Sequence, residues 1–202
     1  MDLKLIELEK NIQVVVIKNF LDKQEYREVF NEISIYLKVN LINYDNPITG
    51  TAVLNGEHFA KEKQSLNLFP NSVYPKYYKK FLGEIKKMCQ SKSLSISYRS
   101  LINSNQDVSW FAKCSNFHEY KSHVDVNTFT QLYYIHKEPK KFTGGDLVFD
   151  DFDYTIPYEN NVMILFPGYL NHSVTKVEST KKLKSIDCRF VFTTFYGVKL
   201  DR

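Results

Sequence analysis

The chain has 202 residues, of which 43% are hydrophobic and 25% charged, and its formal net charge is +4. This composition excludes a disordered or fibrous protein, and so mild a positive charge does not favour a nucleic acid as partner. No apolar run reaches the roughly 20 residues of a membrane span, and the N-terminus MDLKLIELEKN lacks the apolar stretch of a secretory signal. Three scattered cysteines without CxxC spacing indicate free thiols, so we expect a cytoplasmic protein without a membrane partner.

Helical patterns dominate the first part of the chain, residues 1–92. A β-branched run over 12–18 predicts a strand ahead of them. Asp22 is a suitable N-cap for the first helix. The apolar face of that helix holds Tyr26, Val29, Phe30, Ile33 and Leu37. A second helix is predicted over 75–88, and the stretch 41–70 between the helices is interpreted as loop.

Short β-rich runs fill the second part of the chain, residues 93–202, with turn signals such as Gly144-Gly145 and Pro167-Gly168 between them. The predicted strands cover 94–99, 108–114, 129–135, 146–149, 162–166, 170–177 and 187–196. Many short strands at close spacing are typical of a sandwich or barrel. We therefore predict a mainly β (α+β) fold, as one domain over 1–202, with the N-terminal helices packed on one sheet.

Three side chains predict a metal site. His123 and Asp125 flank one residue of an extended segment, so the imidazole and the carboxylate point to the same side. Taken alone, this pair also fits a surface histidine beside a surface aspartate. His172 lies in a later predicted strand, where it could equally be a buried core histidine. Two histidines and one carboxylate form the facial triad of non-haem Fe(II) oxygenases, so we expect these three residues to be the catalytic iron ligands.

Arg189 is expected to bind an anion. It lies in the apolar predicted strand 187–196, where a buried guanidinium is costly without an anionic partner. A dicarboxylate supplies such a partner, because a guanidinium binds a carboxylate through two parallel hydrogen bonds. The alternative is that this side chain leaves the sheet edge and reaches solvent.

These residues together resemble the HxD…H…R signature of the Fe(II)/2-oxoglutarate-dependent oxygenases. The segments HVD, LYYIHKEP, FTGGDLVF, LFPGYLNHSV and RFVFTTFYG are similar to the prolyl-hydroxylase branch of that superfamily. The resemblance covers residues 108–197 and, more loosely, the N-terminal segment VVVIKNFLDKQEYREVFNEI. It implies a double-stranded β-helix, which is a jelly-roll or cupin-like core, over 93–202, with residues 1–92 as its support.

The resemblance also implies roles for three further residues. Tyr134 would donate to the distal carboxylate of 2-oxoglutarate beside Arg189, Thr193 would lie near this cosubstrate, and Tyr120 would line the site. The implied cofactors are Fe(II), 2-oxoglutarate and O2, with ascorbate as an accessory reductant.

Two departures from the family pattern concern the far end of the cosubstrate. The segment between His172 and Arg189 is longer than the usual spacing, and Val191 stands where many relatives carry a hydroxyl. Neither departure affects the expected iron ligands.

The expected activity is hydroxylation of an unactivated C–H bond. The resemblance implies a prolyl or other amino-acid residue of a protein or peptide as substrate, or a free amino acid. Three alternatives stay open: an oxygenase that modifies a small metabolite, a non-catalytic jelly-roll module that binds a metal, and a cupin-type lyase or isomerase. His118 and His136 are interpreted as rim or surface residues, and the acidic stretch 150–153 as a solvated turn. The oligomeric state is not predicted.

Overall fold

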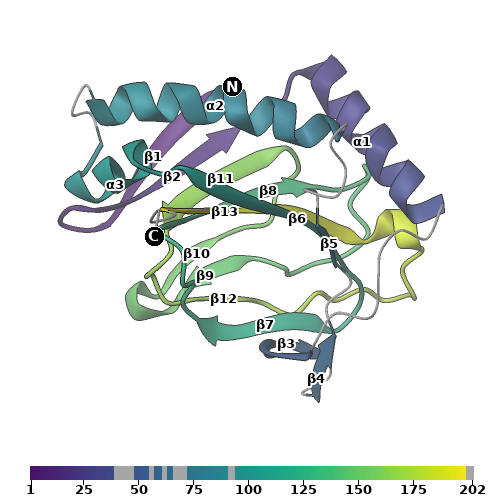
Figure 1. The fold of residues 1–202 in the computed structure, drawn as a ribbon. Helices are drawn as coiled ribbons and strands as arrows, with labels where there is room; N and C mark the ends of the chain where they lie inside the picture. Colours follow the sequence, from purple (N-terminus) through teal and green to yellow (C-terminus); the bar gives the residue numbers. More distant parts are fainter. Residues whose placement is uncertain (39–47, 55–56, 61–62, 66–71, 91–93, 199–202) are drawn as a thin grey trace.

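The computed structural model describes residues 1–38, 48–54, 57–60, 63–65, 72–90 and 94–198, and Figure 1 shows their arrangement. Among these residues the strands form two sheets. The larger one has seven strands, in the spatial order β1 (Asp2–Glu9), β2 (Ile12–Lys18), β11 (Val162–Pro167), β8 (Phe129–Ile135), β13 (Arg189–Gly197), β6 (Gln106–Cys114) and β5 (Lys63–Ser65). All its strand pairs are antiparallel.

The smaller sheet contains, within the described part of the chain, six strands. Their spatial order is β10 (Tyr154–Ile156), β9 (Leu147–Phe149), β12 (His172–Val174), β7 (His118–His123), β3 (Ile48–Leu54) and β4 (Glu57–Ala60). These pairs are also antiparallel. The prediction of a mainly β protein is therefore confirmed.

Helices lie along the outer face of the larger sheet (Figure 1). They are α1 (Lys23–Lys38) and α2 (Val73–Gln90), and shorter helical segments are η2 (Ile96–Tyr98), α3 (Arg99–Ile102), η3 (Asp150–Phe152) and η4 (Ser185–Asp187). Asp22 caps α1 as predicted, because its carboxylate accepts the backbone N–H groups of Gln24 and Glu25 at 2.8 and 2.9 Å. None of the helices in the described residues is long and apolar enough to cross a membrane.

Alternation along the strands of the larger sheet creates two apolar cores. On β13, Phe190 and Phe192 face the helices, and the ring of Phe192 stacks on Tyr74 of α2 with 4.3 Å between centroids. The alternate residues Arg189 and Val191 face the smaller sheet, and Val191 belongs to the core between the sheets. The space between the two sheets is thus reached by every second side chain of β13.

Most predicted strands are found. The runs 12–18 and 129–135 coincide with β2 and β8. The runs 108–114, 146–149, 162–166, 170–177 and 187–196 lie at β6, β9, β11, β12 and β13, of which β12 is much shorter than predicted. The helix predicted over 75–88 lies within α2. Strands β1, β3, β4, β5, β7 and β10 were not predicted. The loop interpretation of 41–70 is wrong where β3, β4 and β5 lie and otherwise falls outside the described residues.

The strand predicted over 94–99 is wrong, since this segment forms η2 and leads into α3. Tyr98 accounts for the difference. Its buried hydroxyl lies 3.0 Å from the carbonyl oxygen of Gln13 and 2.9 Å from that of Leu165, and its ring packs on Phe129 with 4.8 Å between centroids. These contacts with the larger sheet decide the local conformation over the alternating pattern of the sequence.

Candidate active site

The strand pairing of the smaller sheet brings the three predicted metal ligands together. His123 ends β7, His172 begins β12, and the two residues are direct partners in the antiparallel register. Their ring centroids are 4.3 Å apart. Asp125 Oδ1 lies 3.8 Å from His123 Nε2, and Asp125 Oδ2 lies 3.7 Å from His172 Nε2. One donor atom of each residue lies within 4.8 Å of the other two, a spacing that a single metal ion fits.

Backbone carbonyls fix the orientation of both imidazoles. His123 Nδ1 lies 2.7 Å from the oxygen of Lys121, and His172 Nδ1 lies 2.8 Å from the oxygen of Leu170. A carbonyl only accepts, so each Nδ1 carries the proton and each Nε2 offers its lone pair. Burial lowers the pKa of His172, although the negative charge of Asp125 opposes this effect. The neutral ring is the form that binds a metal.

Asp125 lies beyond the end of β7 and is held by two contacts. Its backbone N–H donates to the oxygen of Gly168 at 2.8 Å, and Thr130 of β8 donates a short hydrogen bond to its Oδ2. Thr130 was not singled out by the sequence analysis. The alternation of β8 alone places it on the same face as Leu132, toward the space between the sheets.

Arg189 is buried between the sheets rather than extended to solvent, with 2% of its surface exposed. Its Nε donates to the oxygen of Gly145 at 3.1 Å. Its guanidinium carbon lies 5.1 Å from the ring centroid of Tyr134 and 4.8 Å from that of Tyr158, as in cation–π contacts. Within the described residues, no ion pair joins this arginine to a carboxylate.

One buried polar group beside this guanidinium, the Tyr134 hydroxyl, has no hydrogen-bond acceptor among the described residues. Burial raises the pKa of Tyr134 to about 12, and the neighbouring Arg189 offsets only part of this rise, so the phenol keeps its proton. A buried cation without an anion and a buried donor without an acceptor are both costly. An anionic ligand that accepts from both residues removes both costs.

A cavity of about 130 Å³ between the sheets joins the three metal-site residues to Arg189. Tyr120 and Thr193 both line it, whereas Tyr134 is not among its lining residues and stands against Arg189 instead. The remaining wall is mostly apolar. It consists of Trp110, Ala112, Thr130, Leu132, Val174, Val191 and Phe195.

Tyr158 contacts Arg189 but was missed by the sequence analysis, because it lies far from Arg189 in the chain. Its hydroxyl lies 2.7 Å from the oxygen of Ile135 and 2.9 Å from that of Phe190, so two strands of the larger sheet fix its ring. The ring in turn faces the guanidinium of Arg189. No pattern in the sequence marks this pairing.

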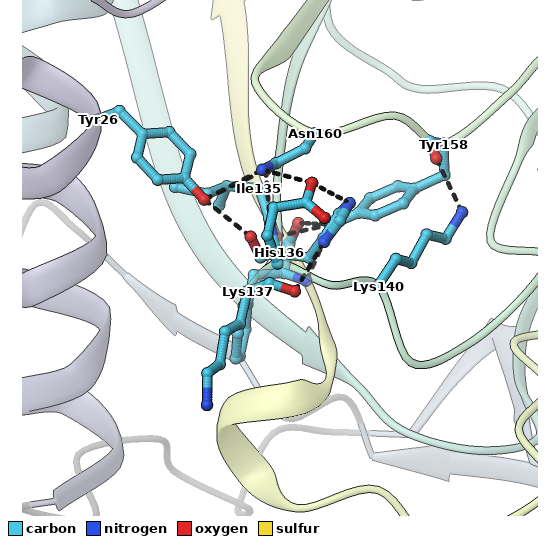
Figure 2. A network of polar contacts seen from close by, with 9 residues as sticks. Tyr26, Ile135, His136, Lys137, Lys140, Tyr158 and Asn160 are labelled. Atoms are coloured by element: carbon cyan, nitrogen blue, oxygen red, sulfur yellow. Dashed lines mark hydrogen bonds and ion pairs between the residues drawn. The ribbon is translucent and has the colours of Figure 1, made fainter. Parts of the chain in front are cut away.

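The interpretation of His118 and His136 as rim or surface residues is wrong. Both are buried, with 5% and 3% of their surface exposed, and neither lines the cavity. Figure 2 shows His136 enclosed by polar partners: its backbone N–H donates to Asn160 at 3.0 Å, and its oxygen accepts from Tyr26 at 2.8 Å. His136 thus links the end of β8 to α1.

Gly145 is required for the position of Arg189. Its φ is +76°, and a Cβ at this position would lie 2.6 Å from Arg189 Cδ. We therefore predict that Gly145→Ala lowers the free energy of unfolding by about 1–3 kcal/mol. The matched control is Gly83→Ala in α2, where a Cβ meets nothing within 4 Å, so stability should stay equal or rise by about 1 kcal/mol. Urea denaturation of both variants checks this, and equal effects would contradict it.

Comparison with known proteins relates part of this chain to a family model. Residues 109–197 match the family model described as the 2OG-Fe(II) oxygenase superfamily. No curated protein sequence matches the chain.

Solved structures share the fold. A prolyl-4-hydroxylase from Pseudomonas putida is 13% identical, with a TM-score of 0.63 over 92% of each chain. A prolyl hydroxylase from Trichoplax adhaerens, solved with a hypoxia-inducible-factor oxygen-degradation-domain peptide fragment, is 16% identical, with a TM-score of 0.65 over 91% of this chain and 83% of that one.

A viral collagen prolyl hydroxylase from Paramecium bursaria Chlorella virus-1, in its 2OG complex, is 16% identical, with a TM-score of 0.57 over 92% of this chain and 96% of that one. Such low identity establishes similarity of fold alone. The family-model match over residues 109–197 and the shared fold support a 2OG-Fe(II) oxygenase that is prolyl-hydroxylase-like.

Proposed function

We propose that the chain hydroxylates an unactivated C–H bond of a prolyl or other amino-acid residue in a protein or peptide, or of a free amino acid. The observation that carries the proposal is the single cavity that joins a His-Asp-His cluster to a buried arginine without a carboxylate partner among the described residues. Such a cavity accommodates a metal at one end and an anionic cosubstrate that spans to the other.

His123 Nε2, His172 Nε2 and an oxygen of Asp125 would hold Fe(II). Imidazole and carboxylate on one side of an ion are the donor set of non-haem Fe(II) oxygenases. With 2-oxoglutarate and O2, the iron supplies the oxidising chemistry that hydroxylates the substrate and leaves succinate and CO2. The chain's own part is to keep Nε2 of both histidines deprotonated, through their Nδ1 contacts with backbone carbonyls, and to orient the Asp125 carboxylate through Thr130.

Arg189 and Tyr134 would bind the distal carboxylate of 2-oxoglutarate. The guanidinium supplies charge, and the unpartnered phenol supplies a neutral donor beside it. Tyr120 and Thr193 would contact the cosubstrate from the cavity wall. Val191 also lines the cavity and offers no hydroxyl. Binding of the distal carboxylate would therefore depend on Arg189 and Tyr134, without the additional hydroxyl that many relatives carry at this position.

We further propose that the two sheets form a double-stranded β-helix and that 1–202 works as one domain. Strand pairing between the two parts of the chain supports this: β2 of residues 1–92 pairs with β11, and β3 pairs with β7. Residues 1–92 would thus support the core formed by 93–202. Three free, buried cysteines agree with a cytoplasmic location.

Peptide substrates are the first candidates to test. The structural neighbours include a prolyl hydroxylase solved with a peptide fragment. Oxidation of a small metabolite is the alternative, and a substrate screen that includes prolyl peptides, free amino acids and small metabolites separates the two.

Removal of one ligand tests the metal assignment. The anaerobic protein with Fe(II) and 2-oxoglutarate should show a visible metal-to-ligand charge-transfer band, and in air it should form succinate. His172→Ala should abolish both signals while circular dichroism shows an unchanged fold. A wild-type protein with neither the band nor succinate formation would contradict the oxygenase function, and tight zinc binding without succinate would favour the non-catalytic module.

Substitution of the arginine tests the cosubstrate assignment. Arg189→Gln should raise the KM for 2-oxoglutarate by about 10- to 100-fold, because a charge-assisted pair is lost, and Tyr134→Phe should raise it by about tenfold. The matched control, Arg99→Gln, changes an exposed arginine of α3 and should leave the KM unchanged. Steady-state succinate assays measure all three. An unchanged KM in Arg189→Gln would refute the assignment.

A further inference from the structure

We propose that Asp150 is a positioning residue that fixes the two metal-binding histidines from the outer side of the smaller sheet. The proposal rests on the metal site proposed above and adds a residue outside the cavity. Asp150 begins η3, directly after the last residue of β9. The sequence analysis interpreted the acidic stretch that contains it as a solvated turn, but this carboxylate binds the two strands that carry the histidines.

Both oxygens of the Asp150 carboxylate accept hydrogen bonds from serines next to the metal ligands. Ser122, which precedes His123, donates to Oδ2 at 2.7 Å. Ser173, which follows His172, donates to Oδ1 at 2.7 Å. One side chain thus links β7 to β12, the two strands whose relative position sets the distance between the imidazoles.

A β-bulge explains why this link is needed. In the pairing of β7 with β12, His172 is opposite His123 and Val174 is opposite Tyr120. Two residues of β7, Lys121 and Ser122, therefore face the single residue Ser173. The extra residue breaks the alternation of β7, so Tyr120 and His123 both line the cavity although their separation is odd. The Asp150 carboxylate holds the bulged Ser122 to the residue opposite it.

Asn171 strengthens the link through the backbone. The N–H of Asp150 donates to the oxygen of Asn171 at 3.1 Å, and Ser122 Oγ lies 2.8 Å from Asn171 Oδ1. The neighbouring Asp151 differs, because its carboxylate accepts from Asn171 at 3.2 Å and has no contact with either serine. Asp151 therefore provides a matched control in the same turn.

Loss of this link should affect metal binding more than folding. Ser122 is exposed and Ser173 half-buried, so water can replace the carboxylate as their partner at little cost in stability. The bulge, however, loses its attachment, and the imidazoles lose their fixed separation. Removal of groups that orient metal ligands typically weakens metal affinity 10- to 100-fold, and an indirect link should lie near the lower value.

Cobalt binding tests the proposal, because the visible spectrum of Co(II) reports on binding without turnover. Asp150→Ala should raise the Kd for Co(II) by about tenfold, while the melting temperature of the metal-free protein stays close to the wild-type value. The double variant Ser122→Ala/Ser173→Ala should give a similar increase. It retains the negative charge of Asp150, so it separates positioning from simple attraction of the cation. Asp151→Ala should bind Co(II) as the wild type does.

Several results would overturn the proposal. They are a Kd in Asp150→Ala within about twofold of wild type, an equal loss in Asp151→Ala, or wild-type binding in the double variant. If Asp150→Ala fails to fold, the double serine variant decides alone. A wild-type protein that binds no Co(II) and forms no succinate would refute the proposed function and this inference together. Normal turnover with unchanged cobalt binding in the variants would refute this inference only.

Discussion

The pairing of β7 with β12 is the constraint on which the site depends. It sets His123 opposite His172 in register, at a ring separation of 4.3 Å, and the turn that follows β11 brings Gly168 against Asp125. Because the three donors come from two strands and the segment after one of them, a small shift in that pairing would separate all of them. The register of a short strand such as β12 is weakly specified by itself, so its neighbours on both sides must hold it.

Charge complementarity governs the other end of the cavity. Arg189 enters the space between the sheets because every second residue of β13 does, and two tyrosine rings and a glycine make room for it. The protein thus retains a buried cation without a carboxylate of its own among the described residues. Burial of a guanidinium without a counter-charge is energetically unfavourable, and a bound ligand with a negative charge would remove this cost.

The sequence predicted the parts of this account that local patterns control. The β-branched run of β2 and the apolar run of β8 coincide with their strands. The HxD spacing together with one later histidine predicted three candidate ligands, and these are the residues that the sheet brings together. What it missed depends on contacts between distant segments. Contacts with the larger sheet hold Tyr98 in a helical turn. Tyr158, in the connection between β10 and β11, faces Arg189 of β13. Asp150 accepts hydrogen bonds from Ser122 of β7 and Ser173 of β12. No spacing within one segment encodes such contacts.

A crystal structure of the protein grown anaerobically with Mn(II) and 2-oxoglutarate tests the central claim most directly. The account predicts one metal ion bound by His123 Nε2, Asp125 and His172 Nε2, with the distal carboxylate of the cosubstrate paired with Arg189 and within hydrogen-bond distance of the Tyr134 hydroxyl. A metal bound elsewhere, or a cosubstrate whose distal carboxylate avoids Arg189, would contradict it.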